Sequence, residues 1–167
     1  MAQPNSFLGR IRAWGNKFVR KLLAFAAVAV MLTAQPALAE IGRIKSLVGE
    51  VTILRNGAAL VGASGFKLEQ GDIIRTGKTG RVGIAFLDNT RMALGPASRI
   101  TLEKFAYDRS RQTGDFVTSV NRGSLGVVSG NIAKSKRDAM RVRTPTSMLG
   151  VRGTKFVVEV KGKGEDK

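Results

Sequence analysis

Few residues of this 167-residue chain could act in catalysis or metal binding, and two of the residue types that serve these roles most often are absent. The sequence contains no His and no Cys, so it offers no imidazole base, no thiolate and no ordinary zinc or copper site. Catalysis would then need paired carboxylates, an activated serine or a bound metal. The 12 acidic residues show no metal-loop spacing, and Ser135-Lys136 and Ser147 have no supporting context for nucleophilic activation. We therefore predict a protein that is not an enzyme and uses no cofactor or metal.

The chemistry that the composition favours is the attraction of anions. The chain carries 28 Lys and Arg residues against 12 Asp and Glu residues, and the basic excess persists after the first 39 residues. Such a charge steers polyanions over long range. The alternatives are a nucleic acid, an anionic or acidic component of the cell envelope, and a surface that is basic only for solubility. The basic positions that could contact a partner are Arg81, Arg91, Arg99, Lys134, Lys136, Arg137, Arg141 and Arg143.

The first 39 residues have the three parts of a secretory signal peptide. A basic region precedes an uninterrupted apolar run over 22–32, and the triplet Ala37-Leu38-Ala39 follows with small residues at its first and last positions. The run is about half of the roughly 20 apolar residues that a spanning helix needs. We predict cleavage after Ala39, so that the mature protein begins at Glu40 in the periplasm after crossing the inner membrane. The alternative is an uncleaved signal that anchors the protein in that membrane.

The segment after this signal has the pattern of short β-strands separated by turns. Apolar and polar residues alternate with a period of two, which suits strands with one face on a core and the other in water. The alternating runs cover 81–86, 99–103, 140–143 and 155–160. We predict a single all-β domain of short antiparallel strands over 40–160, arranged as a sandwich, a jelly roll or a solenoid. Residues 161–167 are predicted to form a flexible basic tail.

Turn residues predict where some of these strands end. Asp88-Asn89-Thr90 should form a hairpin connection in which Asn89 takes the left-handed backbone region. Thr144-Pro145 should end the strand that contains Met140, because the residue before proline favours extended geometry and proline cannot continue a ladder. The polar and basic segment 129–138 is predicted to be a loop or a single helical turn.

Several of these segments follow one another in an order that is similar to a known family. Gly71-Asp72 comes first, Gly123-Ser124-Leu125 follows, and the set ends in a Thr-Pro, a Gly-Val-Arg-Gly-Thr and a Phe-x-Val element. Over about residues 45–160 the chain resembles the FecR domain, the periplasmic all-β module of iron-citrate-type signalling regulators. The resemblance identifies motif positions whose roles we expect to be mainly structural. They are Gly71, Asp72, Thr76, Gly77, Asp88, Pro96, Ser98, Gly123, Thr144, Pro145, Gly150, Arg152, Gly153, Thr154 and Phe156.

The last glycine motif, Gly-Val-Arg-Gly-Thr, has a structural and a functional interpretation. Gly150 and Gly153 flank Val151-Arg152 and should allow a bend or bulge that re-aims the final strand. The functional alternative is a small anion site made by Arg152 and Thr154.

The chain departs from the best-known members of the family at its N-terminal end. Those members are similar to three-part proteins, in which a cytoplasmic segment holds a sigma factor and a spanning helix leads to the periplasmic domain. Here the residues before the apolar run include no acids and no amphipathic repeat, so we expect no sigma-factor binding by this chain. We expect a stand-alone periplasmic module that binds an unidentified envelope protein in sensing or signalling. The alternative is a basic domain for an envelope polyanion or glycan, such as a cell-wall polymer or lipid head groups; the export signal excludes nucleic acid.

Overall fold

The computed structural model describes residues 39–153 and 155–161. Apart from Ala39, the predicted signal peptide lies outside the described residues, as do Thr154 and the predicted tail beyond Lys161. Within the described ranges, no helix has the length and apolar character needed to cross a lipid bilayer.

The described part of the chain is nearly all β-structure, which confirms the predicted fold class. The strands of its first half are β1 (Gly42–Val48), β2 (Val51–Arg55), β3 (Ala58–Val61), β4 (Lys67–Leu68), β5 (Ile73–Thr76), β6 (Arg81–Phe86) and β7 (Arg91–Leu94). Those of its second half are β8 (Arg99–Asp108), β9 (Thr113–Val128), β10 (Met140–Arg143), β11 (Met148–Val151) and β12 (Lys155–Val160). One short helix, α2 (Asn131–Ser135), lies in the segment for which a loop or a helical turn is predicted.

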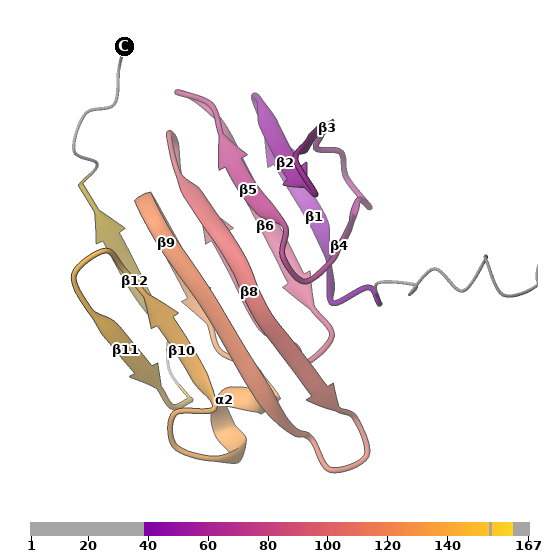
Figure 1. Cartoon of the computed structure of the whole chain (residues 1–167), viewed down its shortest axis with the longest axis vertical. Helices are drawn as coiled ribbons and strands as arrows, with labels where there is room; N and C mark the ends of the chain where they lie inside the picture. Colours follow the sequence, from indigo (N-terminus) through magenta and orange to yellow (C-terminus); the bar gives the residue numbers. More distant parts are fainter. Residues whose placement is uncertain (1–38, 154, 162–167) are drawn as a thin grey trace, which may run out of the picture. The chain divides into compact units, whose positions relative to one another are not determined.

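The strands form a sheet that curls over on itself, because the long strand β9 belongs to both halves (Figure 1). The strand order is β3-β2-β5-β8-β9-β7-β6-β1-β4. The first part of β9, up to Arg122, pairs with β8 and β10. Its last part, from Gly123, pairs with β7 and β12. Among the described strands, the pairing of β9 with β10 is parallel and all the others are antiparallel.

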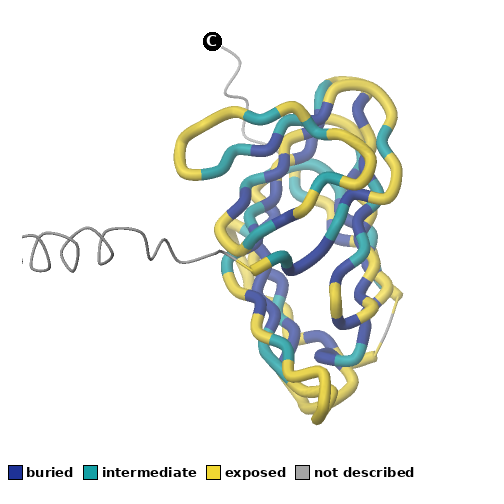
Figure 2. Tube along the Cα trace, turned by 90° about the vertical axis from the view of Figure 1, so that its right-hand side faces the viewer, coloured by how far each residue is buried: buried dark blue, intermediate teal, exposed yellow. Residues whose placement is uncertain are grey.

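The core lies between the two halves of the curled sheet. Buried and exposed residues alternate along strands such as β6 and β7, and Figure 2 shows the buried positions in dark blue along the strands and many of the turns in yellow. The ring of Phe116 in β9 lies edge-on to Phe86 of β6 at 4.7 Å and to Phe105 of β8 at 5.0 Å between centroids. Such pairs contribute about 0.5–1.5 kcal/mol each beyond the area they bury. These aromatic contacts therefore join the two halves of the sheet that β9 connects.

Glycine at position 123 allows β9 to pass from one half to the other. Its backbone has φ of +83°, a region that residues with a Cβ rarely adopt, and an added Cβ would lie 2.5 Å from the Cα of Ser98. The Ser98 hydroxyl accepts a hydrogen bond from the Ser124 N–H at 3.0 Å and donates one to the Ser124 carbonyl at 3.2 Å. The bend is therefore held by the loop that precedes β8.

The turns lie where their residue types predict. Asn89 has φ of +67° in the connection between β6 and β7. The strand β10 ends at Arg143, directly before Thr144-Pro145. Local residue preferences therefore set these strand ends, as the sequence indicates.

Candidate functional site: an arginine-lined groove

The basic residues selected from the sequence divide into those with an acidic partner and those without one. Arg141 and Lys136 lie 3.8 Å and 4.0 Å from Asp115, and Arg143 lies 3.0 Å from Glu103. Glu103 thus compensates the charge of Arg143, whereas Asp115, which also lies 3.5 Å from Lys104, shares one negative charge among three cations. The remaining selected residues make no ion pair within the described part of the chain: Arg81, Arg91, Arg99, Lys134 and Arg137.

Of these unpaired residues, Arg99 lines a groove between the tip of the β10–β11 hairpin and β12. The groove has a volume of about 1170 Å³, which exceeds the roughly 300–1,000 Å³ of sites for small ligands. A segment of a larger molecule fits this size better than a metabolite. The lining residues are Arg75, Arg99, Asn121, Arg122, Thr144, Pro145, Thr146, Ser147, Leu149, Val157, Val158, Glu159, Val160 and Lys161.

Three arginines meet at this groove because of the strand register, and we call them the arginine row. Arg75 of β5 pairs with Arg99 of β8, and Arg99 pairs in turn with Arg122 of β9. Neighbouring strands are about 4.8 Å apart, so the three backbone positions span roughly 10 Å. A bulge at Asn121, where the register between β8 and β9 shifts, brings Arg122 opposite Arg99.

The arginine row is electrostatically uncompensated. Within the described residues, the side chains of Arg75, Arg99 and Arg122 make no ion pair or hydrogen bond, and the Nε atom of Arg122 is buried without an acceptor. The groove lining adds one more cation, Lys161, and a single acid, Glu159. Like charges directly opposite each other on neighbouring strands are destabilising. The row is therefore not accounted for by the stability of the fold, and a bound anion would compensate it.

The walls of the groove add apolar surface and a structured turn. Leu149 of β11 and Val157 of β12 are 44% and 75% exposed, which is high for apolar side chains. At the hairpin tip, the Thr144 N–H donates to the Ser147 carbonyl at 2.8 Å, and the two hydroxyl groups lie 3.0 Å apart. The tip is thus held by its own hydrogen bonds, while the apolar side chains lie open to a partner.

The two strands that border the groove each have an edge without a neighbour. Among the described strands, β11 pairs with β10 and with no other, and β12 pairs with β9 and with no other. The outer edge of a sheet presents main-chain N–H and C=O groups that can pair with an added strand. The groove therefore combines unpaired cations, exposed apolar side chains and free main-chain groups.

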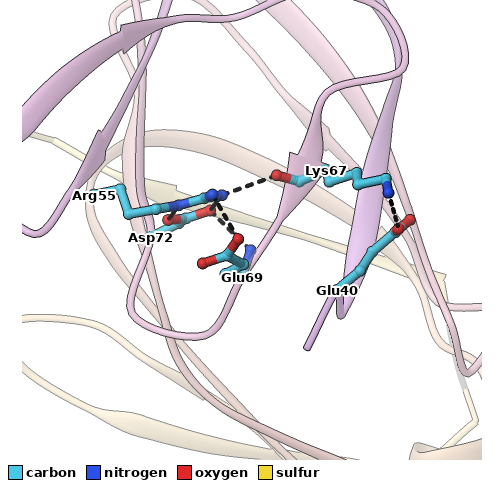
Figure 3. A network of polar contacts seen from close by, with 5 residues as sticks. All are labelled: Glu40, Arg55, Lys67, Glu69 and Asp72. Atoms are coloured by element: carbon cyan, nitrogen blue, oxygen red, sulfur yellow. Dashed lines mark hydrogen bonds and ion pairs between the residues drawn. The ribbon is translucent and has the colours of Figure 1, made fainter. Parts of the chain in front are cut away.

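Four motif residues lie inside the fold and away from the groove lining. Asp72 is fully buried, and its carboxylate accepts hydrogen bonds from Nε and Nη2 of Arg55, both at 2.8 Å (Figure 3). The hydrogen bond and charge of Asp72 raise the pKa of Arg55, against the opposing effect of burial, and the charge of Glu69 adds to this. These contacts hold β2 against the turn before β5. The other three such residues are Thr76, Asp88 and Ser98.

The buried carboxylate of Asp88 and the hydroxyl of Thr76 make equally local contacts. Asp88 accepts hydrogen bonds from the Thr90 hydroxyl at 2.7 Å and from the Ile132 N–H at 3.3 Å, which ties the β6–β7 turn to α2. Thr76 donates to the Gly95 carbonyl at 2.7 Å and accepts from the Ser98 N–H at 2.8 Å. Both side chains therefore tie neighbouring segments of the fold together.

The remaining motif positions are divided between turns, the groove and the end of the chain. Thr144 and Pro145 line the groove, whereas Arg152 is exposed and does not. The alternative anion site at Arg152 includes Thr154, which lies outside the described residues. The others lie in turns or strands away from the groove lining: Gly71, Gly77, Pro96, Gly123, Gly150, Gly153 and Phe156.

Among the groove residues that the sequence analysis did not select are two arginines, Arg75 and Arg122. They are 47 positions apart in the chain and become neighbours of Arg99 through strand pairing alone. One signal could have found them, since each directly precedes a motif residue, Thr76 or Gly123. In the described ranges, no three His, Cys, Asp or Glu side chains gather where they could hold a metal ion.

Comparison with known proteins finds one matching family model, described as FecR protein, over residues 72–166. The matched segment includes β5 to β12 and every residue of the groove lining. No curated protein and no solved structure gives a match.

Proposed function

The chain belongs to the FecR family, and from this premise we propose that it is an exported, non-catalytic module that binds another protein of the cell envelope. FecR domains are regulatory modules of the periplasm that take part in sensing and signalling through partner proteins. For this chain, export follows from cleavage after Ala39, and the binding partner is an envelope protein that docks in the arginine-lined groove.

The observation that carries this proposal is the uncompensated arginine row. Three adjacent cations without an acidic partner cost stability, and they lie beside exposed apolar side chains and unpaired strand edges. A protein partner can use all three features together, through acidic side chains, apolar side chains and its main chain. No catalytic group is needed for this role.

Site-specific crosslinking in intact cells tests the proposal. Because the chain has no cysteine, a single introduced thiol is its unique attachment point for a crosslinker. We expect Thr146→Cys, in the groove, to capture one envelope protein, and Ala63→Cys, on an exposed loop away from the groove lining, to capture none. Capture at Thr146→Cys should be lost when Arg75 and Arg99 are also replaced by Gln. Equal capture from both positions, or capture that ignores the arginine changes, would refute docking in the groove.

The arginine row also favours a second candidate, the binding of an envelope polyanion or glycan. The two candidates differ in their response to salt. Exposed charges are screened within about 10 Å at 0.1 M salt, so a complex held by point charges alone should weaken steeply as salt rises. A packed protein interface should weaken less. Retention of the isolated protein by envelope fractions in high salt, lost when one partner protein is deleted, would rule out the polyanion.

A further inference from the structure

We propose that the partner segment that docks on the arginine row is an α-helix with acidic side chains along one face, and that this helix lies across strands β5, β8 and β9. The inference rests on the proposed function, since it names the chemistry and shape of the partner at the same site. Three observations lead to it: the direction of the arginine row, the spacing of its charges and the composition of the groove around it.

The arginine row runs across the strands and not along one of them. Arg75, Arg99 and Arg122 are paired residues of β5, β8 and β9, which lie side by side in Figure 1, and all three line one groove. Lys161 directly follows the residue that pairs with Gly123 of β9, so a fourth cation lies at the β9 end of the row. A segment that ran parallel to the strands would meet this line of charges at one point. A segment that contacts all of the arginines therefore has its axis along the row.

The spacing of the charges matches one face of an α-helix. Neighbouring strands are about 4.8 Å apart, so the row places three cations over roughly 10 Å. On a helix, residues i, i+4 and i+7 share one face, and a rise of about 1.5 Å per residue separates i from i+7 by about 10.5 Å along the axis. In an extended segment, three acids on one face would span about 13.6 Å. Three acids on a helix therefore face the three arginines in order.

The guanidinium groups of the row are available to such acids. Among the described residues, Arg75, Arg99 and Arg122 make no ion pair or hydrogen bond, and the first two are exposed. Each guanidinium can bind a carboxylate through two parallel hydrogen bonds. Because the charges lie at the tips of long side chains, the helix can follow the row without packing into the pleat of the sheet.

The rest of the groove favours a protein segment over a polymer of sugars or phosphates. None of the described residues that line the groove is aromatic, so it offers no ring against which a sugar could stack. Leu149 and Val157 add exposed apolar surface to its walls, which a phosphate polymer would leave uncovered. A helix can carry apolar side chains beside its acidic face, at the same spacing along its axis. The matching helix thus has an acidic face flanked by apolar residues.

Binding of a synthetic helix to the exported protein tests this inference. The probe is a capped peptide of about 20 residues built from Ala and Gln, because shorter isolated helices are marginal in water, with Glu at positions i, i+4 and i+7. Its control has the same composition, with the three Glu residues on different faces. Fluorescence anisotropy at low ionic strength should show that the control binds on the order of tenfold more weakly. Circular dichroism should show that the probe gains helicity when bound.

Variants of the protein locate the helix. Arg99→Gln, at the centre of the row, should weaken binding of the probe about fivefold. The matched control, Arg141→Gln, should leave binding unchanged, because Arg141 lies beside Asp115 and away from the groove lining. Arg99 makes no ion pair or hydrogen bond among the described residues, so its variant should fold normally, which the thermal midpoint checks.

The two ends of the row show the direction of the helix. Arg75→Gln should reduce the effect of replacing one terminal Glu of the probe by Gln, and Arg122→Gln should reduce the effect of replacing the other. Double-mutant cycles measure both couplings. A segment that lay along a strand would not couple its two ends to different arginines, so the absence of this pattern would contradict a helix across the strands.

Other results would also overturn the inference. Equal binding of the probe and its control, or a probe that gains no helicity when bound, would exclude a helix. Inorganic polyphosphate that displaces the probe equally well at high salt would show a simple polyanion site. If neither peptide binds while capture at Thr146→Cys still depends on Arg75 and Arg99, the acidic-helix inference fails and the proposed function stands. If that capture is also independent of the two arginines, both fail.

Discussion

At the scale of single residues, burial separates the charges that hold the fold from those available to a partner. Asp72 is fully buried and binds Arg55, whose side chain is 21% exposed. Arg99, by contrast, is exposed and has no acidic partner among the described residues. The buried and paired charge of Asp72 holds Arg55 in place within the fold. The exposed and unpaired charge of Arg99 can instead attract an anionic group of a partner.

Replacing Asp72 by Asn should strongly destabilise the domain. The change removes the charge that Arg55 faces, although Glu69 stays within hydrogen-bond distance of Arg55 at 2.7 Å. Because Asp72 is buried, we expect a loss of about 2–4 kcal/mol in the free energy of unfolding. Urea denaturation measures this as a lower midpoint at an unchanged slope.

A more exposed ion pair serves as the control for this prediction. Lys104 lies 3.5 Å from Asp115, and its side chain is 51% exposed. Lys104→Gln should cost less than about 1 kcal/mol. Equal losses for the two variants would contradict the assignment of Asp72 to a buried structural role.

At the scale of elements, the passage of β9 between the halves of the sheet builds the groove. The bulge at Asn121 and the bend at Gly123 bring Arg122 beside Arg99 and leave β10 and β12 on different halves. The groove opens between the hairpin that follows β10 and the edge of β12. The geometry of the candidate site therefore depends on a few residues in the middle of one strand.

Replacing Gly123 by Ala should disturb this bend. The added methyl group would meet Ser98 and would force a side chain into a backbone with φ of +83°. Gly57→Ala is the matched control, since φ is +81° there and an added Cβ meets nothing within 4 Å. The control should cost about 1–2 kcal/mol from the backbone alone, and Gly123→Ala about 1–3 kcal/mol more from overpacking. Thermal and urea denaturation of both variants measure the difference, and equal losses would show that Ser98 does not hold the bend.

At the scale of the whole molecule, the proposed function depends on export and on a net positive charge. The chain is basic overall, and two of its acids, Asp115 and Glu103, each lie within ion-pair distance of at least one cation. Long-range attraction of an acidic partner follows from the total charge, whereas the place of binding follows from the cations that remain unpaired.

The processed protein should begin at Glu40. Removal of residues 1–39 would leave Glu40 in place. Its carboxylate accepts hydrogen bonds from Arg43 at 2.9 Å and 3.0 Å, and Figure 3 shows its ion pair with Lys67, at 3.8 Å. We therefore expect that cleavage keeps every described contact of the domain. Amino-terminal sequencing of the protein from the periplasmic fraction checks this start. An intact Met1 in the membrane fraction would instead support the anchored alternative.

Much of the fold could be predicted because it depends on local preferences. Alternation predicts the buried faces of β6, β8 and β10, and residue type predicts the turn at Asn89 and the strand end before Thr144. Alternation and residue type do not predict that the sheet curls through β9. It depends on a bulge and a close approach between Gly123 and Ser98, which are properties of distant segments in contact.

The fold class, the family, the lack of His and Cys and the excess of positive charge all follow from the sequence, because each depends on composition or on residues close in the chain. Which cations have an acidic partner depends on the tertiary structure. It places Arg143 beside Glu103 and Arg141 beside the shared carboxylate of Asp115, and it aligns Arg75, Arg99 and Arg122 on three neighbouring strands. The physical reason is that charge compensation depends on distances of a few ångströms, and strand register sets those distances between residues far apart in the sequence.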